Sequence, residues 1–320
     1  MKQLANEFLK PIFVMGCQRS GTTMIASQLG APTNSLALPE LPFIINLMKD
    51  ELNNSPANKS YVNLVTHRKF NTLEIEITKQ EFTSTWSTIG AIGIIELIIN
   101  KYLEIKKVKL PKDETINWIE HCPTNIDNFY ILRQFFPNAK FIHIVRDPRA
   151  VYASMKHLIR WEFSDPIKLS MFWLKAVSKG YLLHKTFPDS VIQINYEEYV
   201  QDENVLKELC KFLDIEFSTE MCKGGGVILP SFTQKQHKLT MGKTSTAKID
   251  SWKNKITKKE QNAINFFCAE WMIEHSYLTE EKLHSSPSAM DKRLWRLRST
   301  FLNARAKVVN KLVLKGIMKA

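Results

Sequence analysis

The stretch from Ile12 to Thr23 has the composition of a site that binds phosphate. An apolar run leads into a turn with glycines at positions 16 and 21, and an apolar, helix-like segment follows the turn. In such a strand–turn–helix arrangement, the backbone N–H groups of the turn and the positive end of the helix dipole point at one anion. The spacing Gly16-x4-Gly21-Thr22-Thr23 is that of a Walker A loop, except that Thr22 stands in the position of its lysine.

The cation of this turn is Arg19, which lies before the second glycine. A loop without the lysine that contacts the β- and γ-phosphates is unsuited to ATP or GTP hydrolysis. It suits a nucleotide whose transferable group is not a γ-phosphate. The predicted phosphate contacts are Gln18, Arg19, Ser20, Gly21, Thr22 and Thr23.

A second segment of interest is a strand that ends in an arginine. The continuous β-branched and aromatic residues of 140–145 predict a buried strand, Arg146 follows it, and Ser154 lies eight residues further on in a predicted helix. Open α/β sheets bind ligands at the carboxyl ends of their strands. We therefore expect Arg146 and Ser154 to reach the same phosphate, although Arg146 could instead pair with Asp147 or Glu197.

The two segments, in this order, resemble the 5′-phosphosulfate loop and the 3′-phosphate segment of sulfotransferases. The resemblance is to enzymes that use 3′-phosphoadenosine 5′-phosphosulfate (PAPS), of bacterial type and near the glycan and tyrosylprotein group. It implies a P-loop fold, PAPS as sulfuryl donor and no metal. It also implies nucleotide contacts outside the two segments, at Tyr196 after a predicted strand and at Ser245 and Lys248 in a late basic loop.

The resemblance implies that Glu40 is the base that deprotonates the acceptor, and that Arg19 stabilises charge on the leaving phosphate. His121 marks a departure, because relatives often have a Lys-Thr-Pro-like segment where this chain has Glu-His-Cys-Pro-Thr. His121 could donate a hydrogen bond to the sulfuryl oxygens, act as a second acid or base, or be a structural histidine. The plain alternative for Glu40 is an exposed loop residue.

Strand-like and helix-like segments alternate along the chain, which predicts an α/β fold with a doubly wound parallel sheet flanked by helices. Residues 43–110 have helical patterns only, which predicts a helical insertion. A Ser/Pro-rich break separates a domain of residues 1–286 from a tail of residues 287–320. The tail is a basic amphipathic helix, or two, with Leu294, Leu297, Phe301, Val308 and Leu312 on one side.

Composition narrows the class of partner. The 320 residues carry a net charge of +12, which favours anionic partners, although a solvated basic surface is the plain alternative. The five cysteines are scattered without metal-ligand spacing, and the N-terminus lacks the layout of a signal peptide. We expect a cytoplasmic protein whose tail contacts an anionic membrane peripherally, grips an acidic glycan or packs on the domain. Nothing in the sequence indicates nucleic-acid binding, and the oligomeric state is left open.

The predicted function is sulfuryl transfer from PAPS to an acceptor hydroxyl, preferably on a carbohydrate or glycolipid, with a small-molecule hydroxyl also open. One alternative is a P-loop kinase for a small molecule, against which Thr22 argues. The other is a non-catalytic basic module that binds a nucleotide or a membrane. Whether the acceptor atom is oxygen or nitrogen is not decided by these residues.

Overall fold

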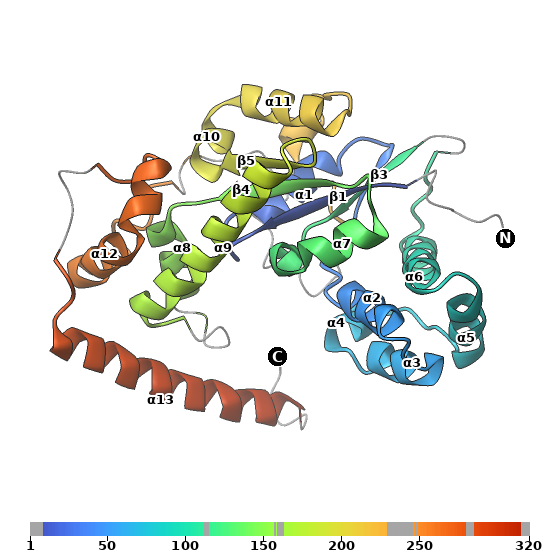
Figure 1. Ribbon diagram of the computed structural model, residues 1–320, viewed down its shortest axis with the longest axis horizontal. Helices are drawn as coiled ribbons and strands as arrows, with labels where there is room; N and C mark the ends of the chain where they lie inside the picture. The colour runs from blue at the N-terminus through green and yellow to red at the C-terminus, as the bar shows by residue number, and fades with distance from the viewer. Residues whose placement is uncertain are drawn as a thin grey trace.

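The computed structural model describes residues 9–111, 115–156, 158, 163–228, 246, 249–279 and 285–314, the side chains of 303 and 306–314 excepted. Within these residues, five parallel strands form one sheet in the order β2-β3-β1-β4-β5 (Figure 1). The predicted parallel α/β fold is confirmed. The strands are β1 (Leu9–Gly16), β2 (Ser35–Ala37), β3 (Ile116–Glu120), β4 (Lys140–Val145) and β5 (Val191–Asn195).

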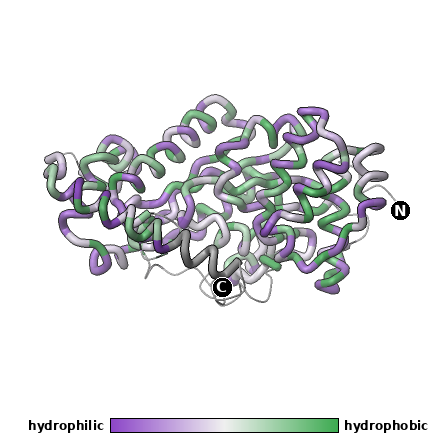
Figure 2. The backbone as a smooth tube through the Cα atoms, turned by 90° about the horizontal axis from the view of Figure 1, so that it is seen from below, coloured by the Kyte–Doolittle hydropathy of each residue, from purple (hydrophilic) through white to green (hydrophobic). Residues whose placement is uncertain are grey.

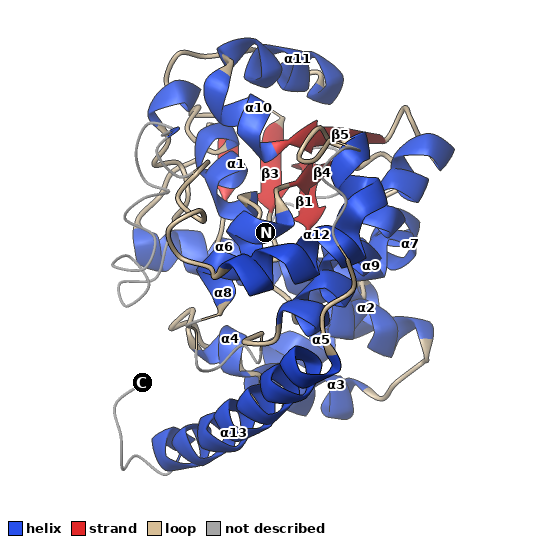
Figure 3. Ribbon diagram, turned by 90° about the vertical axis from the view of Figure 1, so that its left-hand side faces the viewer, coloured by secondary structure: helices blue, strands red, loops and turns tan. Residues whose placement is uncertain are grey.

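Helices cover both faces of the sheet (Figure 3). Side chains alternate along a strand, so Ile12 and Val14 of β1 belong to one apolar core, and Phe13 and Met15 belong to the other. Because both faces of the sheet are buried, β1 and β4 are mostly apolar along their length and do not alternate between polar and apolar residues. The first core includes α1 (Thr22–Leu29), α10 (Tyr196–Gln201) and α11 (Glu203–Leu213); the second includes α7 (Phe129–Phe135), α8 (Pro148–Met155), α9 (Pro166–Thr186) and α12 (Lys258–Glu274).

The predicted helical insertion lies between β2 and β3. Its apolar side chains join the core on the Phe13 side of the sheet, and its longest helix buries Ile94, Ile98 and Tyr102 there. Segments of hydrophobic residues run through the middle of the molecule (Figure 2). The insertion contains α2 (Ile44–Leu52), α3 (Ala57–Val65), α4 (Arg68–Asn71), α5 (Lys79–Thr88) and α6 (Ala91–Lys106).

The structure fixes the ends of two predicted helices. Helix α8 ends at Met155, and the turn at Lys156 places its ammonium 2.9 Å from the buried Glu260 carboxylate. The described part of the tail, up to residue 314, forms one helix, α13 (Ala289–Leu314), on the periphery of the molecule (Figures 1 and 3). Short 3₁₀ segments at Pro123–Asn128 (η1) and Met221–Lys223 (η2) complete the order of elements.

Candidate active site

The turn between β1 and α1 has the backbone of an anion cradle. Gly16, Arg19 and Gly21 have φ angles of 150°, 68° and 111°, all in the region that favours glycine. A Cβ on Gly16 would lie 2.5 Å from the carbonyl oxygen of Ile144 on β4, so this position requires glycine. Arg19 is not a glycine, so its positive φ angle is strained. Non-glycine residues with such strained backbones concentrate at functional sites.

The start of α1 is open to a ligand. Gly21 is its N-cap, no side chain of the described residues caps it, and no acidic residue lies in its first turn. Ser20 is fully buried, and its Oγ makes no hydrogen bond to any described residue. Buried polar atoms are normally paired, so an orphaned hydroxyl beside a helix N-terminus indicates a place for an anionic oxygen.

Three predicted residues from distant parts of the chain meet at this turn. Arg19 Nε donates to Ser154 Oγ over 3.1 Å, and Arg146 donates through Nη1 to the carbonyl oxygen of Arg19 over 3.0 Å. The Arg146 guanidinium also stacks on the ring of Tyr196, 4.0 Å from its centroid. Loss of solvent and then the charge of Arg146 lower the pKa of Arg19, whereas Glu40 raises it. The predicted donor residues Arg19, Arg146, Ser154 and Tyr196 therefore form one cluster.

Arg149 resolves the alternative considered for Arg146. It binds the Asp147 carboxylate through Nε and Nη2, with Nη2 2.7 Å from Oδ2, and donates to the carbonyl oxygen of Tyr277 over 2.8 Å. Glu197 accepts from the backbone N–H of Asp147 and from the hydroxyl of Tyr277. Both nearby acids are thus engaged by other groups, so the Arg146 guanidinium stays at the turn.

Glu40 lies three residues after β2, at the carboxyl edge of the sheet. Its Oε2 is 3.1 Å from the ammonium of Lys69 on α4, and both side chains are partly exposed. Its charge also raises the pKa of Arg19, so the predicted base interacts electrostatically with the donor cluster. Sequence reasoning missed Lys69, because its pairing with Glu40 depends on how the insertion folds.

Glu120, the last residue of β3, was also missed. It is 1% exposed, and its carboxylate accepts from the backbone N–H groups of Leu41 and Cys122 and from Asn125 Nδ2. Burial raises the pKa of Glu120, the three hydrogen bonds oppose that rise, and Glu40 adds to it. The one signal available was a carboxylate at the end of an apolar strand, where burial is costly without partners. Glu120 thereby ties the segment that carries Glu40 to the turn after β3.

The other predicted residues divide into two groups. His121 is buried directly after Glu120. In the cradle, Thr22 is buried, and Gln18 and Thr23 are half-buried. The roles predicted for these four residues stay predictions. Ser245 and Lys248 lie outside the described residues.

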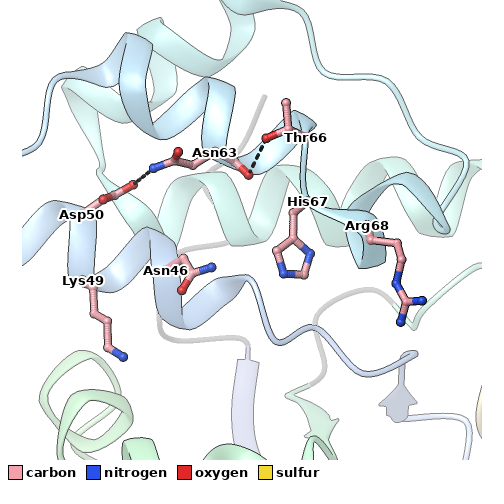
Figure 4. A pocket seen from close by; sticks show the side chains of 7 residues that line it. All are labelled: Asn46, Lys49, Asp50, Asn63, Thr66, His67 and Arg68. Atoms are coloured by element: carbon pink, nitrogen blue, oxygen red, sulfur yellow. Dashed lines mark hydrogen bonds between the residues drawn. The ribbon is translucent and has the colours of Figure 1, made fainter. Parts of the chain in front are cut away.

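A polar cavity opens on the insertion beside Lys69. Its volume is about 500 Å³, and Figure 4 shows side chains of α2 and of the chain from α3 to α4 around it. Arg68 and His67 are at the end next to Lys69, and His67 Nδ1 accepts from the backbone N–H of Lys69. The cavity is a candidate for the acceptor side of the site. Its lining residues are Asn46, Lys49, Asp50, Asn63, Thr66, His67 and Arg68.

Comparison with known proteins decides the family. The pattern described as the sulfotransferase family matches residues 11–219, which is more than half of the chain. The chain belongs to the sulfotransferase family. The match begins within β1 and ends after α11, and so includes the donor cluster, Glu40 and Glu120. The family therefore indicates sulfuryl transfer as the reaction of this site.

Relatives and a solved structure agree with this assignment. The chain is 26% identical over 231 residues to a Caenorhabditis briggsae protein named "Putative protein-tyrosine sulfotransferase", covering 68% of this chain and 70% of that protein. It is 24% identical over 263 residues to protein-tyrosine sulfotransferase 1 of Danio rerio, covering 78% and 68%. The sulfotransferase domain of the Synechococcus PCC 7002 olefin synthase shares the fold, with a TM-score of 0.58, 19% identity, and coverage of 85% of this chain and 95% of that domain.

Proposed function

We propose that this sulfotransferase moves the sulfuryl group of PAPS to an acceptor hydroxyl. The observation that carries the proposal is the convergence of Arg19, Ser154 and Arg146 on the open N-terminus of α1. Two guanidinium groups beside a helix N-terminus form a site for more than one anionic group. A nucleotide with both a 5′-phosphosulfate and a 3′-phosphate has two such groups.

The donor side of the site fits such a nucleotide. The orphaned Ser20 hydroxyl and the first N–H groups of α1 suit the 5′-phosphosulfate, with Arg19 at the same turn. Arg146 Nε also makes no hydrogen bond within the described residues, and together with Ser154 it suits the 3′-phosphate. The Tyr196 ring, already stacked under Arg146, lines the nucleotide side.

The residues on the acceptor side supply the base. The Glu40 carboxylate takes the hydroxyl proton while the acceptor oxygen forms its bond to sulfur and the bond from sulfur to the bridging oxygen breaks. The products are the sulfated acceptor and 3′-phosphoadenosine 5′-phosphate, whose new charge Arg19 and the N–H groups of the turn stabilise. Lys69 orients the Glu40 carboxylate through the 3.1 Å contact, and His121 remains a candidate for the sulfuryl oxygens.

We infer that the acceptor is the hydroxyl of a tyrosine in a peptide. The names of the two relatives support this acceptor over the carbohydrate that the sequence favoured. A carbohydrate or glycolipid hydroxyl is the second candidate, because the cavity beside Lys69 is lined by polar side chains suited to binding hydroxyl groups. The cytoplasm stays the proposed compartment, to be tested by cell fractionation.

The donor is tested by calorimetric titration with 3′-phosphoadenosine 5′-phosphate, ADP and Mg-ATP. We expect binding that requires the 3′-phosphate and weakens at least about tenfold in Arg146→Ala, the loss of one charge-assisted contact. Lys211→Ala, which removes an exposed cation of α11, is the matched control. No preference over ADP, or turnover of Mg-ATP, would overturn the proposal in favour of a kinase.

The acceptor is tested with labelled PAPS and a panel of tyrosine peptides, oligosaccharides, glycolipids and amines. Label on tyrosine peptides alone supports the first candidate, and label on sugars alone replaces it with the second. Label on amines would show nitrogen transfer. Glu40→Gln should abolish transfer while leaving nucleotide binding unchanged, and normal transfer by this variant would exclude Glu40 as the base.

A further inference from the structure

The tail helix α13 exposes a stripe of large apolar side chains. Met290, Leu294, Leu297 and Phe301 are 72%, 58%, 59% and 70% exposed. Their spacing of four, three and four residues places them on one face of the helix, because a helical turn takes 3.6 residues. Single exposed apolar residues are ordinary, but four in a row on one helix face indicate an interaction surface.

Other sides of α13 hold it to the protein. Trp295 and Ser299 lie opposite the stripe and are buried. Asp291 and Arg298 lie between that side and the stripe, and contact Lys259 and Glu260 of α12 at 2.9 Å and 3.9 Å. The apolar stripe is therefore not the docking face of the helix. The helix lies along the periphery of the molecule (Figure 1), and the exposed fractions show that its apolar stripe faces solvent.

The charge of α13 identifies the surface that fits the stripe. The helix has three lysines, four arginines and a single acid, Asp291, which Lys259 and Ser288 already engage. Arg293, Arg296 and Arg305 are exposed. At 100° per residue, the first two lie on one side of the stripe and Arg305 lies on the other. An apolar strip with cations on both sides is the pattern of helices that lie in the interface of an anionic membrane.

We propose that α13 docks this enzyme on an anionic phospholipid bilayer. Met290, Leu294, Leu297 and Phe301 insert among the acyl chains nearest the headgroups, and the flanking arginines contact the phosphates. A nucleic acid would match the cations but not the apolar stripe, and a neutral protein partner would match the stripe but not the cations. The contact goes beyond sulfuryl transfer, because it places the active site next to acceptors carried on a membrane.

The test uses the full chain in sedimentation with vesicles of phosphatidylcholine alone and vesicles that also contain phosphatidylglycerol. We expect binding only to the anionic vesicles, weakened by salt because screening reduces the attraction. The variant Leu297→Ser/Phe301→Ser should bind at least about tenfold more weakly, and Arg293→Gln/Arg296→Gln should do the same. Leu182→Ser, an equally exposed leucine on α9, is the matched control.

Nucleotide binding and the unfolding transition verify that each variant is folded, since none of these residues belongs to the active site. Vesicle binding that survives the Leu297/Phe301 change would overturn the proposal. So would the absence of binding to anionic vesicles, and a concentration-dependent dimer by light scattering would then assign the stripe to a second copy. Failure of the donor titration would count against PAPS and leave this result standing, because vesicle binding needs no nucleotide.

Discussion

Removing the Glu120 carboxylate should damage both stability and catalysis. In Glu120→Ala, the backbone N–H groups of Leu41 and Cys122 and the amide of Asn125 lose their acceptor in a buried place. Each buried donor without a partner costs about 1–3 kcal/mol, part of which relief of the buried charge offsets. We expect the free energy of unfolding to fall by about 3–5 kcal/mol, a large share of the roughly 5–15 kcal/mol typical of a domain.

Glu120→Gln is the more informative variant because it keeps one acceptor oxygen. With that oxygen facing Asn125, the new NH₂ group faces the backbone N–H of Leu41, so one hydrogen bond is lost, at about 1–2 kcal/mol. The Leu41 N–H follows Glu40 directly in the chain, so a looser Leu41 misplaces the base. We expect kcat to fall about tenfold, since misplacement by a fraction of an ångström carries such penalties. The dissociation constant for 3′-phosphoadenosine 5′-phosphate should not change.

The assay combines urea unfolding, followed by tryptophan fluorescence, with transfer kinetics and nucleotide titration. Glu216→Gln, at an exposed position, is the matched control. A Glu120→Ala protein that unfolds within about 1 kcal/mol of the wild type would show that the three donors find other acceptors. If Glu120→Gln kept the wild-type kcat, the carboxylate would have no part in positioning Glu40.

Two further predictions concern the donor cradle and the sheet. In Gly21→Ala, the φ angle of 111° disfavours the new side chain, whose Cβ would lie 2.8 Å from the Tyr196 ring. Nucleotide affinity should therefore fall at least about tenfold. Unchanged affinity by calorimetry would contradict this geometry of the cradle. Burial lowers the pKa of His143 from 6.5 to about 4, so the unfolded state binds the extra proton between these values and stability falls as pH drops through that window. Between pH 7 and pH 4.5, the free energy of unfolding of His143→Gln should therefore fall by about 2.5 kcal/mol less than that of the wild type. Equal falls for the two proteins in urea unfolding would mean that this histidine is not buried in its neutral form.

Most of the fold and half of the site could be predicted because their signals are local. The β-branched and aromatic residues within Lys140–Val145 mark a strand buried on both faces, and the structure places β4 at those residues. The glycine spacing at 16 and 21 reflects φ angles that the turn itself requires. Arg146 and Ser154 were singled out by the resemblance to sulfotransferases, and the fixed geometry of a strand end and its following helix supported placing them together.

What lay beyond the sequence are contacts that join distant segments. Lys69 and Glu40 meet across 29 residues, and Leu41 and Glu120 across 79, because the insertion folds back on the carboxyl edge of the sheet. No local sequence pattern predicts that the insertion folds back in this way.

The tail shows the same division. Helical periodicity in the sequence predicted an apolar side of α13, and the structure places Leu294, Leu297 and Phe301 on it. The side chains of Val308 and Leu312, also predicted there, lie outside the description. Periodicity fixes which residues share a face, but not which face meets the protein. Packing decided that question: Trp295 and the ion pairs to α12 turn the apolar stripe of Leu294, Leu297 and Phe301 toward solvent, because burying one aromatic side chain and pairing the charges holds the other face inward.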